Sequence, residues 1–409
     1  MEIRPIFSAM MRSKTGVILI AVQIALTLAI LSNALYVVRD RTSEANRVSG
    51  VDDANVFMIA IIDKNTDGVI TRQKRDEDAL RAIPGIASVA WTTQMPLSQS
   101  GSNTGIQTNP KQTESVASPA VYAGNETLVK TFGLKVIEGR DFNAADMQEI
   151  DPTLPDQLKP KVALVTKALA KKLYPNDASA IGKMFYQGRG DPPIEIIGVV
   201  DTLVTPWGRA NWNTPSNGDE SFILPARYVQ PYNIYAVRSE PGQRERVMKE
   251  AEKALLGLEQ GRLVVQNESM DQLRESRYRS EYTMANGLLI VIGLLLLMTA
   301  SGIVGLASLW VNQRRKQIGV RRALGARRVD ILRYFVTENV MICVFGIVLG
   351  SGLAIALNRA MMSELELQRL PLGYLLMGAV ALLTLGVLAV LGPAWRAAQI
   401  APAIATRSA

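Results

Sequence analysis

The sequence predicts a membrane protein with four α-helical spans and a large mixed α/β extracytoplasmic domain between the first and second spans. The first observation is that the 409-residue chain contains long runs without Asp, Glu, Lys or Arg, and each could cross a hydrocarbon core of about 30 Å as a helix. The second is that a long polar segment between them alternates short apolar stretches with helical patterns, as mixed α/β domains do. The charge-free runs are Gly16–Val38, Tyr282–Val311, Asn339–Asn358 and Leu370–Trp395.

The first run could also be a signal peptide. It is longer than a typical signal core of roughly 7–15 residues, and Asn33-Ala34-Leu35 is a poor cleavage site. We therefore expect a retained signal-anchor. The predicted parts are a cytoplasmic N-terminus (1–15), span one (16–38), a periplasmic domain (39–281), span two (282–311), a cytoplasmic loop (312–330), span three (331–357), a short periplasmic loop (358–370), span four (371–395) and a cytoplasmic C-terminus (396–409).

Charge is distributed unequally along the chain. Residues 39–281 contain 30 Lys+Arg and 32 Asp+Glu, whereas the remainder contains 15 and 5. The net charge of +8 therefore belongs to the membrane part, which argues against nucleic-acid binding by a basic domain. The basic residues concentrate in 1–15, in 312–330 and in the tail, and the positive-inside rule places these segments in the cytoplasm. We expect a multi-pass protein of the bacterial inner membrane with both termini inside.

Composition excludes several kinds of catalytic and metal site. The sequence has no histidine and one cysteine, Cys343, so Ser-His and Cys-His catalysis, histidine metal sites, internal disulfides and thiolate zinc sites are excluded. Gly182-Lys183 lacks the other positions of a phosphate-binding P-loop. Cys343 lies in the third run and is expected to be an inert apolar residue. We expect a non-catalytic chain with no cofactor of its own.

The domain at 39–281 is expected to contain two α/β subdomains joined to the spans by helical stalks. The polar stretch 98–118 predicts a loop or hairpin excursion. Segments 35–49 and 267–281 place charged residues at helical spacing and predict the stalks, although flexible tethers would fit the composition too. The predicted strands are 56–62, 87–91, 162–165, 193–200, 236–238 and 263–265, and the predicted helices are 76–83, 167–174 and 244–256.

One stretch of the outer domain matches the start of an EF-hand calcium loop. Asp63, Asn65 and Asp67 have the ligand spacing, and Gly68 stands at the bend. Lys74 occupies the position of the bidentate glutamate, and the preceding segment resembles a strand. A polar turn is therefore favoured over a calcium site, and we expect no metal.

The cytoplasmic loop carries the most specific pattern. A short amphipathic basic helix is expected, followed by a turn at Gly325-Ala326 and the start of span three. On composition alone, a basic segment held by anionic lipid would be favoured over a docking element. The apolar side of the helix is predicted from Ile318, Ala323, Leu324, Val329 and Leu332.

The sequence R-R-K-Q-I-G-V-R-R-A-L-G-A-R-R-V-D-I-L at 314–332 resembles the loop of the MacB-like and FtsX-like permeases of ABC transporters. The ending P-A-W-R-A-A-Q-I-A-P-A-I-A at 393–405 is similar to that family's ending. In the outer domain, E-G-R-D-F at 138–142, the stretch 162–177, I-G-K at 181–183 and I-I-G-V-V at 196–200 resemble its periplasmic core domain. The resemblance covers nearly the whole chain and agrees with the predicted topology.

This resemblance implies a permease that transmits work from a separate cytoplasmic ATPase, which would hold ATP and Mg. It also implies a second permease copy, either identical or related, and a periplasmic adaptor with an outer-membrane channel could complete an export system for a peptide, drug or toxin. Lipoprotein release and control of a cell-wall hydrolase are alternatives, and a signalling receptor is a rival from another class. The resemblance assigns ATPase coupling to Arg314, Arg315, Lys316, Ile318, Gly319, Arg321, Arg322, Ala323, Leu324, Gly325, Ala326, Arg327 and Arg328.

Two further features leave alternatives open. Ser301, Gly302 and Gly305 in span two have the spacing of close helix packing, which would fit a dimer seam or a seam within the chain. Trp207 and Trp212 lie in an irregular stretch that could contact a partner, but packing against their own domain is favoured.

Overall fold

The computed structural model describes residues 14–63, 67–151, 154, 159–188, 191–208, 218–365 and 369–399. It divides into two compact units, Met1–Ser43 with Glu281–Ala409, and Glu44–Ser280. We call the first the membrane unit and the second the outer domain.

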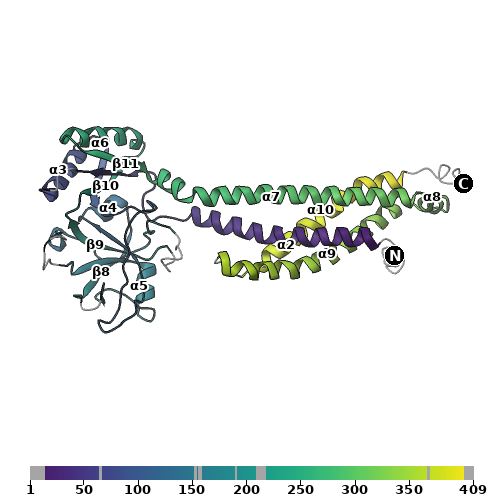
Figure 1. Ribbon diagram of the computed structural model, residues 1–409, viewed down its shortest axis with the longest axis horizontal. Helices are drawn as coiled ribbons and strands as arrows, with labels where there is room; N and C mark the ends of the chain where they lie inside the picture. The colour runs from purple at the N-terminus through teal and green to yellow at the C-terminus, as the bar shows by residue number, and fades with distance from the viewer. Residues whose placement is uncertain are drawn as a thin grey trace. The chain divides into compact units, whose positions relative to one another are not determined.

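The membrane unit is built from long helices (Figure 1). Four of the described helices are long and apolar enough to cross a membrane, which confirms the predicted class. They are α2 (Lys14–Ala45), α7 (Met270–Gln313), α9 (Arg328–Leu365) and α10 (Leu372–Ala398), and the short α8 (Arg315–Ala323) lies between α7 and α9 in the chain.

The seam between α2 and α9 is formed by glycines. A Cβ added to Gly346 or Gly350 would lie within 2.9 Å of α2 backbone atoms, so both glycines allow the two backbones to approach closely. Hydrogen bonds supplement this packing, because Asn33 Nδ2 donates to the Ala354 carbonyl at 3.1 Å and the Thr27 and Thr299 hydroxyls lie 2.8 Å apart. These contacts fix α2 against both α9 and α7.

The outer domain contains an 11-stranded mixed sheet whose main path runs β11-β1-β10-β2-β3-β9-β6-β8-β4. The strands are β1 (Val56–Ile62), β2 (Ile86–Thr92), β3 (Ala120–Gly124), β4 (Val136–Gly139), β5 (Gln148–Ile150), β6 (Val162–Thr166), β7 (Met184–Phe185), β8 (Ile194–Val200), β9 (Ser221–Tyr228), β10 (Tyr232–Ser239) and β11 (Leu263–Ser269). The helices are α3 (Val69–Arg81), α4 (Leu128–Phe132), α5 (Lys167–Leu173) and α6 (Arg244–Leu258), with a 3₁₀ turn at Ala144–Asp146.

The sheet is nearly divided in its middle. Strands β2 and β3 share the single residue pair Thr92–Gly124. One hydrophobic cluster, which includes Phe57, Leu80 and Val247, joins β1, β2 and β10 to α3 and α6, whereas a second, which includes Phe185 and Phe222, joins β6, β8 and β9 to α5. Figure 1 shows α3 and α6 beside β10 and β11, and α5 beside β8 and β9. The outer domain therefore has two cores on one continuous sheet.

Several element predictions differ from the structure. Helix α3 begins at Val69 rather than 76, because Gly68 adopts a left-handed conformation (φ 61°) that turns the chain out of the preceding segment. Strands β3, β4, β5, β7 and β9 and helix α4 were not predicted from the sequence. The most central of these is β9, which pairs with β3, β5 and β6. Pro225 lies within β9. Because proline is disfavoured in central strands, its presence argues against predicting a strand at this position.

Candidate functional site: basic helix α8 and the anchored root of α7

Helix α8 has clearly defined ends. Arg314 precedes it, and Gly325 follows it with φ 98°, a left-handed conformation that suits glycine. The next helix begins directly, and the Asp330 carboxylate accepts a hydrogen bond from the Arg327 N–H at 2.9 Å. The expected sequence of short helix, turn and span is therefore present in this part of the chain.

Arginines on one side of α8 hold it to the bundle. Arg314 Nη1 lies 2.9 and 2.8 Å from the two carboxylate oxygens of Glu338, which is buried in α9. The Arg321 guanidinium lies 5.1 Å from the centre of the Tyr334 ring, and Arg322 Nη1 donates to the Ala398 carbonyl at 3.1 Å. These contacts connect α8 to α9 and α10.

The opposite side of α8 presents apolar residues in a basic surface. Leu324 is 83% exposed and Val320 is 50% exposed, and they stand four residues apart, one turn along the helix. Arg315 and Lys316 are exposed as well, and Lys316 stands one turn before Val320. Two exposed apolar side chains framed by cations form a knob of the kind that a groove in a protein partner can cover. We call Arg315, Lys316, Val320 and Leu324 the α8 knob.

The predicted single apolar side of this segment is wrong. Ile318 is buried, but Leu324 and Val329 are among the most exposed apolar residues of the described chain. Packing separates them, because Ile318 joins a cluster with Ile331 and Phe335 whereas Leu324 has no such neighbours. The predicted coupling residues accordingly divide into three groups by burial. Arg314, Ile318, Gly319, Arg321 and Arg322 face the bundle or are buried, Ala326 is half-buried, and Arg315, Lys316, Ala323, Leu324, Gly325, Arg327 and Arg328 are exposed or lie in the turn.

A cavity between α8 and α9 is too small for a substrate. It measures about 70 Å³ and is lined by residues that include Ile318, Arg321 and Tyr334. Ligand pockets usually occupy roughly 300–1,000 Å³. This cavity therefore does not accommodate a small-molecule ligand.

Glu338 is the residue of this site that the sequence analysis missed. It stands one position before the charge-free run that begins at Asn339. An isolated carboxylate at the edge of an apolar run, close in sequence to a strongly basic loop, could have suggested an ion pair with that loop.

The predicted small-residue positions in α7 do not form one seam. Gly302 faces Gln23 of α2, since an added Cβ would lie 2.6 Å from its amide oxygen. Ser301 and Gly305 are exposed, and an added Cβ on Gly305 would meet nothing within 4 Å. Gly302 therefore packs within the chain, whereas Ser301 and Gly305 remain on an uncovered face.

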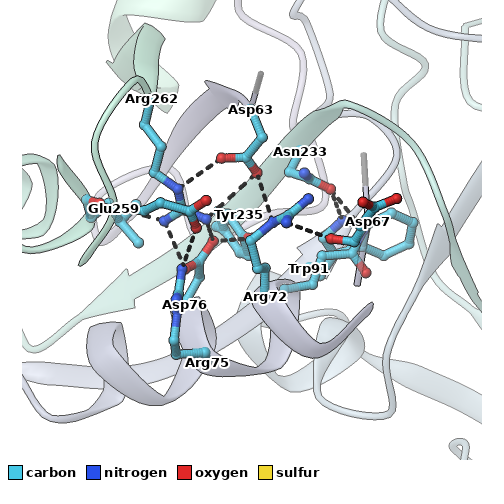
Figure 2. A network of polar contacts seen from close by, with 12 residues as sticks. Asp63, Asp67, Arg72, Arg75, Asp76, Trp91, Asn233, Tyr235, Glu259 and Arg262 are labelled. Atoms are coloured by element: carbon cyan, nitrogen blue, oxygen red, sulfur yellow. Dashed lines mark hydrogen bonds and ion pairs between the residues drawn. The ribbon is translucent and has the colours of Figure 1, made fainter. Parts of the chain in front are cut away.

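In the outer domain, a buried ionic network fixes β11, the strand that leads directly into α7 (Figure 2). Arg262 precedes β11 and its side chain is 1% exposed. Its Nε donates to Asp63 at 2.7 Å, and its two Nη atoms donate to the two oxygens of Asp76 at 2.8 Å. The Tyr235 hydroxyl also donates to Asp76, at 2.8 Å. The end of β1, helix α3 and strand β10 are thereby attached to the start of β11.

The electrostatics of this network follow from burial and charge. Burial lowers the pKa of Arg262, but the hydrogen bonds and charges of Asp76 and Asp63 raise it further, so the net shift is upward. Burial, followed by the charge of Asp76, raises the pKa of Tyr235 well above its usual range. Arg262 is therefore a permanent cation and Tyr235 a permanent donor at physiological pH.

The first turns of α7 are fastened as well. Arg274 Nη1 donates to the carbonyl oxygens of Ala45 and Arg47 at 2.9 and 2.8 Å, and its Nη2 donates to Asp53. Ala45 is the last residue of α2. The outer ends of α2 and α7 are therefore tied to one another.

The calcium-like stretch is occupied by other contacts. Asp63 pairs with Arg262, and the Asp67 backbone carbonyl accepts a hydrogen bond from Arg72. Asn65 lies outside the described residues, as does Trp212 of the tryptophan-containing loop. Within the described ranges, no three acidic or cysteine side chains are grouped as metal ligands would be. The carbonyl of Trp207 accepts a hydrogen bond from Arg277, so this residue is attached to its own domain.

Comparison with known proteins identifies both units. Residues 15–254, more than half of the chain, match the model of the MacB-like periplasmic core domain, and residues 289–402 match that of the FtsX-like permease C-terminal domain. A Macrolide export ATP-binding/permease protein MacB from Salmonella choleraesuis is 26% identical over 247 residues, which are 59% of this chain and 36% of the relative. A protein of the same name from Shewanella sp. is 26% identical over 71% of this chain and 42% of its own length. The chain thus spans less than half the length of these relatives.

Two solved structures are similar to parts of the chain. The periplasmic region of MacB from Actinobacillus actinomycetemcomitans is 15% identical, with a TM-score of 0.34, over 57% of this chain and 97% of that chain. The extracellular domain of the noncanonic ABC-type transporter YknZ from Gram-positive bacteria is 17% identical, with a TM-score of 0.32, over 51% of this chain and 100% of that chain.

Proposed function

The chain belongs to the MacB-like periplasmic core domain family and carries an FtsX-like permease C-terminal domain, and from this premise we propose that it is the membrane permease subunit of an ABC transporter. In this proposal a cytoplasmic ATPase on a partner chain binds ATP and Mg, and the permease itself is not catalytic. Four apolar helices fit a multi-pass protein of the inner membrane. Both termini and α8 would lie in the cytoplasm, as the positive-inside rule requires.

The observation that carries the proposal is the α8 knob. Val320 and Leu324 are exposed on a helix that the Arg314–Glu338 ion pair holds in place. An exposed apolar pair on a fixed support gains free energy when a partner covers it, because apolar surface leaves water. The surrounding cations favour a groove with an acidic rim, such as a partner ATPase could offer.

The connections of α8 suggest how movement would be transmitted. Helix α7 is unbroken over its 44 residues, which is about 66 Å at 1.5 Å per residue. One end precedes α8, and the other follows β11, whose position depends on Arg262. A displacement of α8 would therefore be passed along α7 to its first residues, which follow β11. Transmission of this kind is what mechanotransmission between the ATPase and the periplasmic domain requires.

We further propose that two copies of the permease operate together. Helix α7 leaves a largely apolar face uncovered, which includes Ile290, Leu294, Leu297 and Val304 in addition to Ser301 and Gly305. The substrate would be exported, with a peptide, drug or toxin as candidate classes; the relatives are named for macrolide export. Export is preferred to lipoprotein release or hydrolase control because the matched core domain is the MacB-like one.

The test uses the tagged full chain, purified from native membranes and analysed for a bound ABC ATPase by mass spectrometry. We expect the ATPase to copurify with the wild type and to be lost, by roughly tenfold or more, from V320E/L324E, since removal of a central apolar contact costs about 1–2 kcal/mol or more. Val48→Glu is the matched control, because Val48 is 72% exposed in the outer domain. Unchanged recovery with V320E/L324E, or failure of any ATPase to copurify with the wild type, would contradict the proposal.

A further inference from the structure

A cavity at the other end of the membrane unit has the composition of an anion-binding site with an apolar wall. It lies where the end of α9 meets the start of α10 and measures about 360 Å³, within the range of ligand pockets. Its polar lining is Asn358, Arg359 and Arg369. Its apolar lining is Ile355, Met362, Leu370, Leu372 and Leu375.

The polar side chains of this cavity carry N–H donors that have no acceptor among the described residues. Neither Arg359 nor Arg369 forms an ion pair within the part of the chain that the structure describes, although both are exposed. Asn358 is 3% exposed, and its Oδ1 accepts a hydrogen bond from the Leu370 N–H at 2.9 Å. Its Nδ2 is buried and has no hydrogen-bond partner among the described residues. A buried N–H without an acceptor destabilises the fold, so this position favours a ligand that brings an acceptor.

The complementary ligand follows from this set of groups. Two guanidinium groups and an amide N–H require an acceptor with negative charge and several oxygens, and a phosphate group satisfies guanidinium in two-pronged geometry. The apolar wall requires a hydrocarbon beside the phosphate. A free anion would leave Ile355, Leu372 and Leu375 unused, whereas a phospholipid would cover them with an acyl chain.

We propose that this cavity, between the end of α9 and the start of α10, binds the phosphate group of an anionic phospholipid. Arg359 and Arg369 bind the phosphate oxygens, Asn358 Nδ2 donates the third hydrogen bond, and an acyl chain lies along the apolar wall. The cavity lies at the ends of α9 and α10 that are remote from α8. Because α8 is proposed to lie in the cytoplasm, the bound lipid belongs to the outer leaflet of the membrane. This assignment is independent of the substrate and of the partner ATPase.

The test measures lipid retention by the full chain in detergent, using native mass spectrometry with phosphatidylglycerol or phosphatidylcholine added. We expect phosphatidylglycerol to be retained preferentially. Substitution of one arginine should weaken its binding about 5-fold and R359Q/R369Q about 30-fold, as follows from the contribution of each basic residue near an anionic headgroup. Arg39→Gln is the matched control, because Arg39 is an exposed arginine near the outer end of α2 and lies outside the cavity lining.

Two further arms decide the source of the phosphate and the role of the amide. Inorganic phosphate is added alone, with thermal unfolding as the readout; stabilisation equal to that by phosphatidylglycerol would overturn the lipid assignment in favour of a free anion. Asn358→Asp places a carboxylate against the phosphate and should lower phosphatidylglycerol retention while the protein still elutes as a folded species. Equal retention of both lipids, or R359Q/R369Q with wild-type retention, would overturn the proposal.

Discussion

Substituting Arg262 with methionine should strongly destabilise the outer domain. Methionine preserves most of the side-chain length but removes the three hydrogen bonds of 2.7–2.8 Å to Asp63 and Asp76. In the wild type Asp63 is 6% exposed and Asp76 fully buried, and without Arg262 each would keep only a long ion pair of 3.9 Å, with Arg72 and Arg75 respectively. Breaking a buried pair from one side costs about 3–5 kcal/mol, because an uncompensated charge remains. This is a large part of the roughly 5–15 kcal/mol by which a typical domain is stable.

The assay is thermal unfolding of the full chain in detergent, combined with hydrogen exchange. For a domain of this size the loss corresponds to roughly 6–20 °C in Tm, and amides of β1 and β11 should lose protection first because Arg262 joins those strands. Arg262→Lys keeps the charge but cannot reach both carboxylates in the same geometry, so an intermediate loss is expected.

Lys74→Met is the control for Arg262→Met. Lys74 forms an equally short ion pair, 2.6 Å to Glu149, but both side chains are more than half exposed, so its loss should cost at most about 1 kcal/mol. A loss of stability of about 1 kcal/mol or less in Arg262→Met would refute the role of the buried network. So would a loss in Lys74→Met as large as that in Arg262→Met.

Three other substitutions give separate tests. Gly350→Leu should destabilise the membrane unit by about 1–3 kcal/mol, because the new side chain would clash with the α2 backbone. Gly352→Leu is the control and should not destabilise it, because Gly352 has open space around it. Thermal unfolding in detergent distinguishes the two variants. Glu338→Gln should loosen α8 by removing the carboxylate that Arg314 binds, so protease cleavage near α8 should accelerate, and unchanged cleavage would exclude this role. Burial raises the pKa of Glu77 above its ordinary 4.5 despite Arg227 and Arg81, so its protonated form is favoured on folding. The stability of the wild type relative to Glu77→Gln should therefore fall as pH rises from 4.5 through the raised value, and a pH-independent difference would contradict this.

The sequence could predict the helices and strands that depend on a local pattern of residues. Charge-free runs identified the four spans, because length and apolarity are sufficient for a membrane helix. Strands β1, β6 and β8 were predicted from short apolar runs, and α8 from basic amphipathic spacing. In each case the deciding residues are contiguous.

What the sequence could not show depends on residues that are far apart along the chain. The Arg262–Asp63 pair joins positions 199 residues apart, and Arg314 meets Glu338 across 24 residues. The same holds for Gly346 and Gly350, whose spacing was visible but whose partner, α2, was not. Ser301 and Gly305 have the same spacing but are both exposed, and an added Cβ on Gly305 would meet nothing within 4 Å. Small-residue spacing therefore indicates where helices can approach, and only the fold shows where they do.

The arginines of this chain illustrate why composition alone could not assign its sites. Arg262 and Arg314 each form an ion pair with a buried carboxylate, and these ion pairs hold β11 and α8 in place. Arg315 and Arg359 have no such carboxylate in the described chain and are exposed. Because a guanidinium cannot lose its proton, an arginine without an internal acceptor must find water, lipid or a protein partner. These two groups of arginines lie at opposite ends of α9, one on a helix that also exposes valine and leucine and one beside a buried amide N–H that has no partner among the described residues. The first environment suits a protein groove and the second a phosphate, so one side chain type serves two recognition chemistries.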